Sequence, residues 1–326
     1  MNKMLVWVVN RTEDNDIIAQ SYEECMQLLD PQEQSRIKGY RFQKDAFSSL
    51  VGQVLPRAAI CRHIPDISLQ QLQFHRTSIG RPFMTISNCC SFNPTSPSMA
   101  LPDYNISHHG EYIALIMAPF SGSTVSNLSS GNSQDQWRVG VDLTKIDQRE
   151  IDDPETFFGY FDEQFSKLEW EWIRHGVTGE ANVLVGMAVV SPDSIVSSSI
   201  ITFQPKNDHN QDMIRRFHCM WALKEAYVKG VGCGIVTNLQ DIVFLVSSYN
   251  SNNPSTIKLW QKQLSVTLMI HGKISHDWLF QVQLVDEQHI ICMASTSKYK
   301  GDLSFDIVKW SNVLDNCGIR ILNHDP

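Results

Sequence analysis

The chain has 326 residues, of which 42% are hydrophobic and 19% charged, a composition typical of a globular protein that folds unaided as one large or two modest domains. Its formal net charge of −8 argues against nucleic acid as a bulk electrostatic partner. The eight cysteines include no C-x-x-C pair, so we expect neither a disulfide framework nor a structural zinc site, and reduced thiols predict a cytoplasmic protein.

The first part of the sequence predicts one strand, then helices, then further strands. Apolar spacing is helical between about 21 and 64, where Asp30 and Pro31 form a typical helix start. The polar stretch 121–136 is rich in serine, asparagine and glycine, which predicts a loop and a domain boundary. The predicted strands are short apolar runs at 4–9, 72–75 and 112–118, and the first is too short for a secretory or membrane segment.

The second part begins with an alternating strand, "WRVGVDLTKI", which places Asp142 and Thr144 on its polar face. Helical spacing follows over 153–176, and the segment 177–212 is interpreted as an insertion. A mostly apolar helix is predicted over 216–230. The later strands are predicted near 241–247, 257–259, 264–270 and 278–285, the last turning into a hairpin at Asp286–Gln288.

This order of elements predicts an α+β fold built from two similar halves, residues 1–136 and 137–326. The second half would contain the insertion near 177–212 and end in a C-terminal extension of about 25 residues. No ordered run of β-α-β units occurs, which argues against a parallel, doubly wound sheet.

Asp142 is the first candidate for chemistry. A carboxylate on the polar face of a strand is usually unremarkable, but Gly140 on the same face leaves room beside it for a ligand. Mg²⁺ characteristically binds one or two carboxylates together with phosphate oxygens of a substrate. Asp142 is therefore either an ordinary strand residue or a metal ligand.

Glu225 and Lys229 lie one turn apart in "RFHCMWALKEAYVKG". Such a pair is often a solvated helical contact worth roughly 0.2–0.5 kcal/mol. The helix is so apolar that most of it must be buried, and buried charges need partners. The glycine-rich exit "KGVGCGI" would let backbone approach a ligand.

A further group of candidates is basic. His108 and His109 in "NISHHG" precede a buried strand, and an imidazolium can hold phosphate. The region 36–62 contains a single acid, Asp45, and a cationic excess that suits either a phosphorylated ligand or an ordinary solvated helix face. These cations are Arg36, Lys38, Arg41, Lys44, Arg57 and Arg62.

Taken in order, "GRP", "NISHHG", "GVDL", "FSKLEWEW" and "WALKEAYVKGVGCG" resemble the 4′-phosphopantetheinyl transferases of the broad-specificity, surfactin-synthetase-activating type. The resemblance covers most of residues 30–300. It implies transfer of the phosphopantetheine arm of coenzyme A to a serine of a carrier domain, with release of 3′,5′-ADP. It also implies a pseudo-dimeric fold whose coenzyme A site lies between two halves.

Residue by residue, the resemblance implies that Asp142 and Glu225 bind Mg²⁺ with the pyrophosphate oxygens. Lys229 would contact phosphate and stabilise the departing ADP, and His108 would grip a coenzyme A phosphate. Glu169 matches an acid assigned to the metal or to serine deprotonation. The remaining coenzyme A contacts implied by the motifs are Arg36, Ser49 and Arg81.

Thr144 is a departure from the family pattern. Many bacterial members carry a second acid there, so the metal site must be completed by water, by Glu169 or by a neighbour. Eukaryotic members also often lack this acid, and the polar insertions fit a fungal or other eukaryotic member.

The resemblance predicts carrier domains of aminoadipate reductase (lysine biosynthesis), polyketide synthases and nonribosomal peptide synthetases (secondary metabolism) as partners, and a monomer with no membrane association. One alternative is a catalytically silent protein that binds coenzyme A or a carrier. Another is a metal phosphohydrolase built from His108, His109, Asp142 and Glu225, although such a site would need more ligands than this sequence offers.

Overall fold

The computed structural model describes residues 3–64, 67–86, 101–119, 137–146, 151, 153–176, 209–234, 238–248, 256–259, 262–297, 299, 301 and 303–319. The chain forms two compact units. Unit 1 contains residues 1–143, 229–232 and 300–326, and unit 2 contains 144–228 and 233–299. Strand β6 (Val139–Lys145) and helix α8 (His209–Val231) each contribute residues to both units.

Unit 1 is organised around a four-stranded sheet of order β13-β1-β5-β4. Strand β5 (Tyr112–Met117) is buried along its whole length, as the sequence predicts, and pairs antiparallel with β1 (Leu5–Asn10) and β4 (Tyr104–His109). A separate hairpin joins β2 (Leu72–Arg76) to β3 (Pro82–Ile86). The "GRP" motif lies at the start of β3 in this hairpin.

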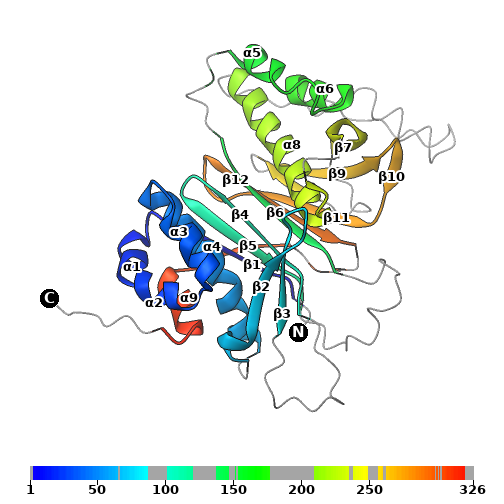
Figure 1. The fold of residues 1–326 in the computed structure, drawn as a ribbon. Coiled ribbons are helices and arrows are strands. Elements are labelled where there is room, and N and C mark those ends of the chain that lie inside the picture. Colours follow the sequence, from blue (N-terminus) through cyan, green and yellow to red (C-terminus); the bar gives the residue numbers. More distant parts are fainter. Residues whose placement is uncertain are drawn as a thin grey trace, which may run out of the picture. The chain divides into compact units, whose positions relative to one another are not determined.

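Helix α4 (Gln43–His63) packs against this sheet, and α1 (Asn15–Gln20), α2 (Tyr22–Gln27) and α3 (Pro31–Lys38) pack against α4 (all blue in Figure 1). The predicted start of α3 is confirmed, because Asp30 accepts hydrogen bonds from the Gln32 and Glu33 backbone while the Glu33 side chain returns to the Asp30 amide. Burial of α4 against β4 and β5 supplies much of the core.

The C-terminal segment corrects the predicted organisation. The sequence analysis places it with the second half, but residues 300–326 belong to unit 1. Strand β13 (Asp306–Ile307) pairs parallel with β1, and α9 (Trp310–Asn316, red in Figure 1) lies beside α1 and α4. The cause is Trp310, which is fully buried and donates its indole N–H to Ser21 Oγ at 3.0 Å.

In its described residues, unit 2 combines a predominantly antiparallel sheet with α-helices. The sheet order is β10-β9-β8-β11-β12-β6, with β7 (Ile242–Ser248) paired to β9 (Lys262–Ile270). The remaining strands are β8 (Thr256–Leu259), β10 (Lys273–Ser275), β11 (Trp278–Leu284) and β12 (His289–Thr296). Helix α8 packs with α5 (Pro154–Gly159) and α6 (Lys167–His175) through aromatic contacts centred on Phe217.

The described residues therefore have a mixed α and β architecture in which antiparallel strand pairs predominate. Strand β1 pairs parallel with β13, and β8 pairs parallel with β11. Most of the predicted insertion, 177–208, and the predicted loop 121–136 lie outside the described residues. No helix of the described part is long and apolar enough to cross a membrane.

Trp310→Ala should destabilise the protein by about 3–5 kcal/mol, because it empties a large buried site and removes a buried hydrogen bond. Chemical denaturation of the full chain measures this loss. Ile307→Ala is the matched control, since Ile307 lies three residues earlier but is 55% exposed, and it should change stability by less than about 0.5 kcal/mol. Equal effects at the two positions would contradict the assignment of the C-terminal segment to the core.

Candidate active site

The backbone N–H groups along one edge of strand β6 are held by side chains of β4 and of the residue that precedes β4. Asp103, Asn105 and Ser107 alternate with apolar residues, so they project from one face of the strand. Each accepts a hydrogen bond from a backbone N–H of β6: Val139 to Asp103 (2.8 Å), Val141 to Asn105 (3.1 Å) and Leu143 to Ser107 (3.1 Å). These bonds fix the register of β6 and place Asp142 beside Ser107.

Asp142 and Lys229 form an ion pair within unit 1. Lys229 Nζ lies 2.5 Å from Asp142 Oδ1, and the Asp142 carboxylate is almost fully buried. Lys229 also donates to Ser107 Oγ at 3.1 Å, and that hydroxyl donates to Asp142 Oδ1 at 3.2 Å. Ser107 therefore uses both lone pairs, for Leu143 N–H and Lys229, and its single proton for Asp142.

Glu225 lies one turn before Lys229 on α8 and is half-buried. It belongs to unit 2, whereas Asp142 and Lys229 belong to unit 1, so a metal ion shared by Asp142 and Glu225 stays a prediction. The described residues contain no group of three or more His, Cys, Asp and Glu suited to hold a metal. One buried carboxylate on a rigid strand, completed by substrate phosphates and a second carboxylate, nevertheless fits the oxygen ligands that Mg²⁺ prefers.

His108 occupies the exposed end of β4, next to Ser107. Partial burial, followed by the positive charges of Lys229 and His109, lowers its pKa below the ordinary value of 6.5, while Asp45 acts in the opposite sense. At neutral pH the ring is therefore uncharged in the ligand-free protein. A bound phosphate would reverse this, because an anion favours the imidazolium.

Arg36 and Ser49 come from the two helices that precede this sheet edge. Arg36 is exposed in the last turn of α3, and with the Gln53 amide turned into its hydrogen-bonding orientation it donates to that amide at 2.8 Å. Ser49 is half-buried on α4, one turn after Asp45. Helix α4 contacts β4, and a Cβ built at Gly52, three residues after Ser49, would lie 3.6 Å from the Ile106 side chain of β4.

The Arg81 guanidinium is buried and bound to other groups of the protein, whereas a residue that contacts a nucleotide needs an accessible side chain. Its side chain is 5% exposed and forms an ion pair with Asp103. The same guanidinium donates to the backbone carbonyls of Lys229 and Gly230. These contacts favour a role in holding the protein rather than the coenzyme.

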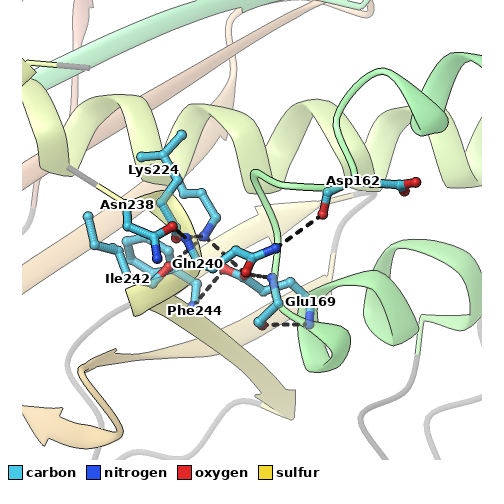
Figure 2. Close-up of polar contacts among 9 residues, drawn as sticks. Asp162, Glu169, Lys224, Asn238, Gln240, Ile242 and Phe244 are labelled. Carbon is cyan, nitrogen blue, oxygen red and sulfur yellow. Dashed lines mark hydrogen bonds and ion pairs between the residues drawn. The ribbon is translucent and has the colours of Figure 1, made fainter. Parts of the chain in front are cut away.

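Glu169 is likewise buried in the protein interior, and Figure 2 shows its polar contacts. Its carboxylate accepts hydrogen bonds from the Ser166 amide at 2.8 Å and the Phe244 amide at 3.0 Å, and it pairs with Lys224 at 3.0 Å. The side chain has no exposed surface. A group so enclosed is poorly placed to deprotonate a serine or bind a metal, and we assign it to the fold.

Lys224 completes this buried group. Its ammonium donates to the carbonyls of Leu239 at 2.7 Å and Ile242 at 2.5 Å as well as to Glu169, so each of its three protons has an acceptor. Burial lowers the pKa of Lys224 and raises that of Glu169, while each charge acts against that shift in the other. The pair joins α6, α8 and the start of β7.

Two further predicted positions are structural in character. Thr144, at the place of the second family acid, is 4% exposed on β6. Trp221, on α8, is half-buried, stacked on Phe217 and edge-on to Phe161, so it packs within the aromatic cluster around Phe217.

The sequence analysis does not single out Asp103, Asn105 and Ser107. The sequence contains a signal for them, because these three polar residues alternate with the apolar residues Tyr104 and Ile106. The interpretation of "NISHHG" rests on its histidines and leaves that alternation unused. The structure shows that these polar side chains position β6, and that Asn105 and Ser107 are buried.

Lys224→Met should cost about 3–5 kcal/mol of stability, because it leaves the Glu169 carboxylate buried without its counter-charge. Lys224→Met combined with Glu169→Leu should recover most of this loss. Lys167→Met is the control, as Lys167 is exposed on α6. Denaturation midpoints of the variants test the prediction.

If Glu169→Gln instead keeps stability but lowers the rate of transfer by several orders of magnitude, the carboxylate acts in the chemistry.

Two regions of the chain match models of known protein families. Residues 17–120 match the family model described as the N-terminal part of 4′-phosphopantetheinyl transferase. Residues 138–294 match the model of the 4′-phosphopantetheinyl transferase superfamily. The two matched regions contain every predicted site residue.

Similar curated proteins agree. The chain is 27% identical over 272 residues to the L-aminoadipate-semialdehyde dehydrogenase-phosphopantetheinyl transferase of Xenopus laevis, covering 83% of this chain and 69% of the relative. It is 26% identical to the phosphopantetheinyl transferase of Thraustochytrium, covering 82% and 69%. It is 22% identical to the 4′-phosphopantetheinyl transferase pptA of Paxillus involutus, covering 80% and 74%. The chain therefore belongs to the 4′-phosphopantetheinyl transferase superfamily and is a transferase of this type.

Proposed function

We propose that the enzyme moves the 4′-phosphopantetheine group of coenzyme A onto the hydroxyl of a carrier-domain serine, with 3′,5′-ADP as the leaving group. The observation that carries this assignment is the Lys229–Asp142 pair, which joins two family motifs from distant parts of the chain. It presents a lysine, 28% exposed at its side chain, next to a buried carboxylate on a rigid strand. That combination suits binding of a pyrophosphate.

Asp142 and Glu225 would supply the protein ligands of Mg²⁺. The bound ion would neutralise charge on the pyrophosphate oxygens of coenzyme A as the phosphoanhydride bond breaks. Ser107 keeps the Asp142 carboxylate oriented by its hydrogen bond to Oδ1. Since Thr144 brings no charge, we propose that water completes the ligand set.

Lys229 and His108 would bind the phosphates. The Lys229 ammonium is anchored by Asp142 and Ser107, so it meets an incoming phosphate without a large loss of side-chain freedom. The uncharged His108 can accept a proton when the dianion arrives. Arg36 and Ser49 would contact the 3′-phosphate, whereas the buried contacts of Arg81 and Glu169 argue against direct contact by either.

The names of the relatives guide the choice of acceptor. Several are named as transferases of L-aminoadipate-semialdehyde dehydrogenase, so the carrier domain of an enzyme of this class is the first substrate to test. Broad specificity for synthase carriers, a monomeric state, a cytoplasmic location and a pseudo-dimeric relation of the two units remain part of this proposal.

The deciding experiment incubates the protein with an apo carrier domain, coenzyme A and Mg²⁺, and measures the intact mass of the carrier. A mass gain equal to one phosphopantetheine, lost on addition of a chelator, is expected. No gain on several carriers would contradict transfer, and coenzyme A binding without transfer would indicate the silent binder.

Glu225→Gln should lower the turnover by roughly 10²–10³-fold while leaving stability close to wild type, because it removes one charged metal ligand from a half-buried position. Asp142→Asn should act similarly, with an added loss of the Lys229 contact. Steady-state transfer rates against Mg²⁺ concentration measure the effect. Glu163→Gln, at an exposed position of unit 2, is the control. Wild-type turnover in Glu225→Gln would refute the metal assignment.

Coenzyme A affinity should fall as pH rises between about pH 5 and 8 by an amount that His108→Gln removes. The pKa of His108 is lowered in the free protein, and a bound phosphate raises it, so binding takes up a proton over the interval between the two pKa values. Calorimetry in buffers of different ionisation enthalpy measures that proton. The difference between wild type and His108→Gln cancels the titration of coenzyme A itself, and His75→Gln is the control.

A further inference from the structure

The end of helix α8 carries both a proposed active-site lysine and carbonyls that the helix cannot satisfy itself. The last four carbonyls of any helix lack intrahelical partners, and they concentrate the negative end of its dipole. In α8 these include the carbonyls of Lys229 and Gly230, because the helix ends at Val231. A buried helix end of this kind needs a donor from elsewhere in the chain.

Arg81 is that donor. One of its terminal nitrogens, Nη1, donates to the carbonyl of Lys229 and to that of Gly230, the latter at 2.6 Å. The other, Nη2, pairs with Asp103 and donates to the Val139 carbonyl at 3.3 Å. The guanidinium thus binds the end of α8 on one side and the start of β6 on the other.

Asp103 fixes Arg81 in turn. Its carboxylate accepts the Val139 N–H at 2.8 Å, and its own carbonyl accepts the Ala118 N–H at 2.8 Å at the end of β5. Burial raises the pKa of Asp103, and the adjacent Arg81 counteracts that rise. The aspartate is therefore held by the sheet, and the arginine stabilises its charged form.

Gly232 makes room for this arrangement. Its φ of +77° lies in the left-handed region, and a Cβ built there would lie 2.8 Å from Arg81 Cδ. The sequence analysis predicts that the glycine-rich exit of α8 lets backbone approach a ligand. In the structure the group that approaches Gly232 is the side chain of Arg81.

We propose that Arg81 is a positioning residue of the transfer reaction, which places Lys229 by binding the backbone carbonyl of that same residue. Asp103 and Gly232 complete the device. The inference rests on the proposed function for the role of Lys229. It assigns Arg81 to catalysis through Lys229 rather than to contact with the nucleotide.

Lysine cannot replace the guanidinium here. Arg81 presents two terminal nitrogens in a fixed plane, which lets it span an aspartate and two carbonyls at once, whereas an ammonium is a single point donor on a flexible stem. Arg81→Lys keeps the charge and loses the span. The matched control is Arg76→Lys, in the same hairpin, where the exposed guanidinium donates only to the nearby Gly80 carbonyl.

The first measurement separates kcat from coenzyme A binding. Arg81→Lys should lower kcat by about 10- to 100-fold, the size expected when a reacting group is misplaced by about 1 Å. Its calorimetric Kd for coenzyme A should stay within about two- to threefold of wild type. A weakened Kd with unchanged kcat at saturating coenzyme A would overturn the proposal in favour of direct contact. Arg76→Lys should alter neither quantity.

The second measurement is a double-mutant cycle with Lys229→Ala. If Arg81 acts through Lys229, adding Arg81→Lys to Lys229→Ala lowers the residual rate by less than about twofold. Independent, multiplying effects on kcat would overturn the proposal.

The third measurement does not depend on transfer. Amide hydrogen exchange at Val231 and Gly232 should be faster in Arg81→Lys than in wild type or Arg76→Lys, with exchange in β5 unchanged. If wild type lacks transfer while this local effect is present, the proposed function fails and the helix-end contact stands. Unchanged exchange would refute the contact. Should Arg81→Lys fail to fold, Asp103→Asn, which keeps the shape and removes the counter-charge, takes its place with the same expected pattern.

Discussion

Helix α8 must bury cations, and their partners determine where the helix lies. Arg216 is 3% exposed and donates to carbonyls at the end of α6, and the buried Lys224 pairs with Glu169. The partly exposed Lys229 pairs with the buried Asp142. A buried ammonium or guanidinium without acceptors would cost several kcal/mol, so rotation or sliding of the helix is strongly opposed. Because Glu225 follows Lys224 directly, the orientation of the metal-binding candidate depends on the buried salt bridge between Lys224 and Glu169.

The polar contacts between β4 and β6 likewise satisfy groups that would be costly to bury without a partner. Side chains of Asp103, Asn105 and Ser107 accept the N–H groups of β6 that a neighbouring strand would otherwise accept. The replacement leaves the Ser107 hydroxyl within reach of Asp142. Backbone satisfaction and orientation of the carboxylate are therefore one network, and a change in either part would disturb the other.

Local features of the fold could be predicted from the sequence because they depend on neighbours along the chain. The cap at Asp30 and the alternation in β6 are of this kind. The residues of the candidate site came from the order of family motifs, since no spacing alone brings Asp142 to Lys229. The partner of Glu169 and the contacts of Arg81 depend on packing between distant segments, which the sequence does not show. The motifs therefore predict a metal or base role for Glu169 and a coenzyme A contact for Arg81, and the contacts of these residues favour neither role. The C-terminal segment was misplaced for the same reason, because only the completed core shows where Trp310 fits.

Residues 303–319 supply an edge strand and a buried tryptophan to unit 1, although all of unit 2 precedes them in the chain. A ribosome adds about 5–20 residues per second, so unit 2 is fully synthesised before the core of unit 1 can close. During that interval one edge of β1 has no strand beside it, and the cavity that receives Trp310 is empty. In a newly made chain, unit 1, which carries Asp142 and His108, therefore has an incomplete core until residues 303–319 are added. A translation error or a proteolytic cut near residue 310 would leave that core incomplete and so disturb a site whose residues lie much earlier in the chain.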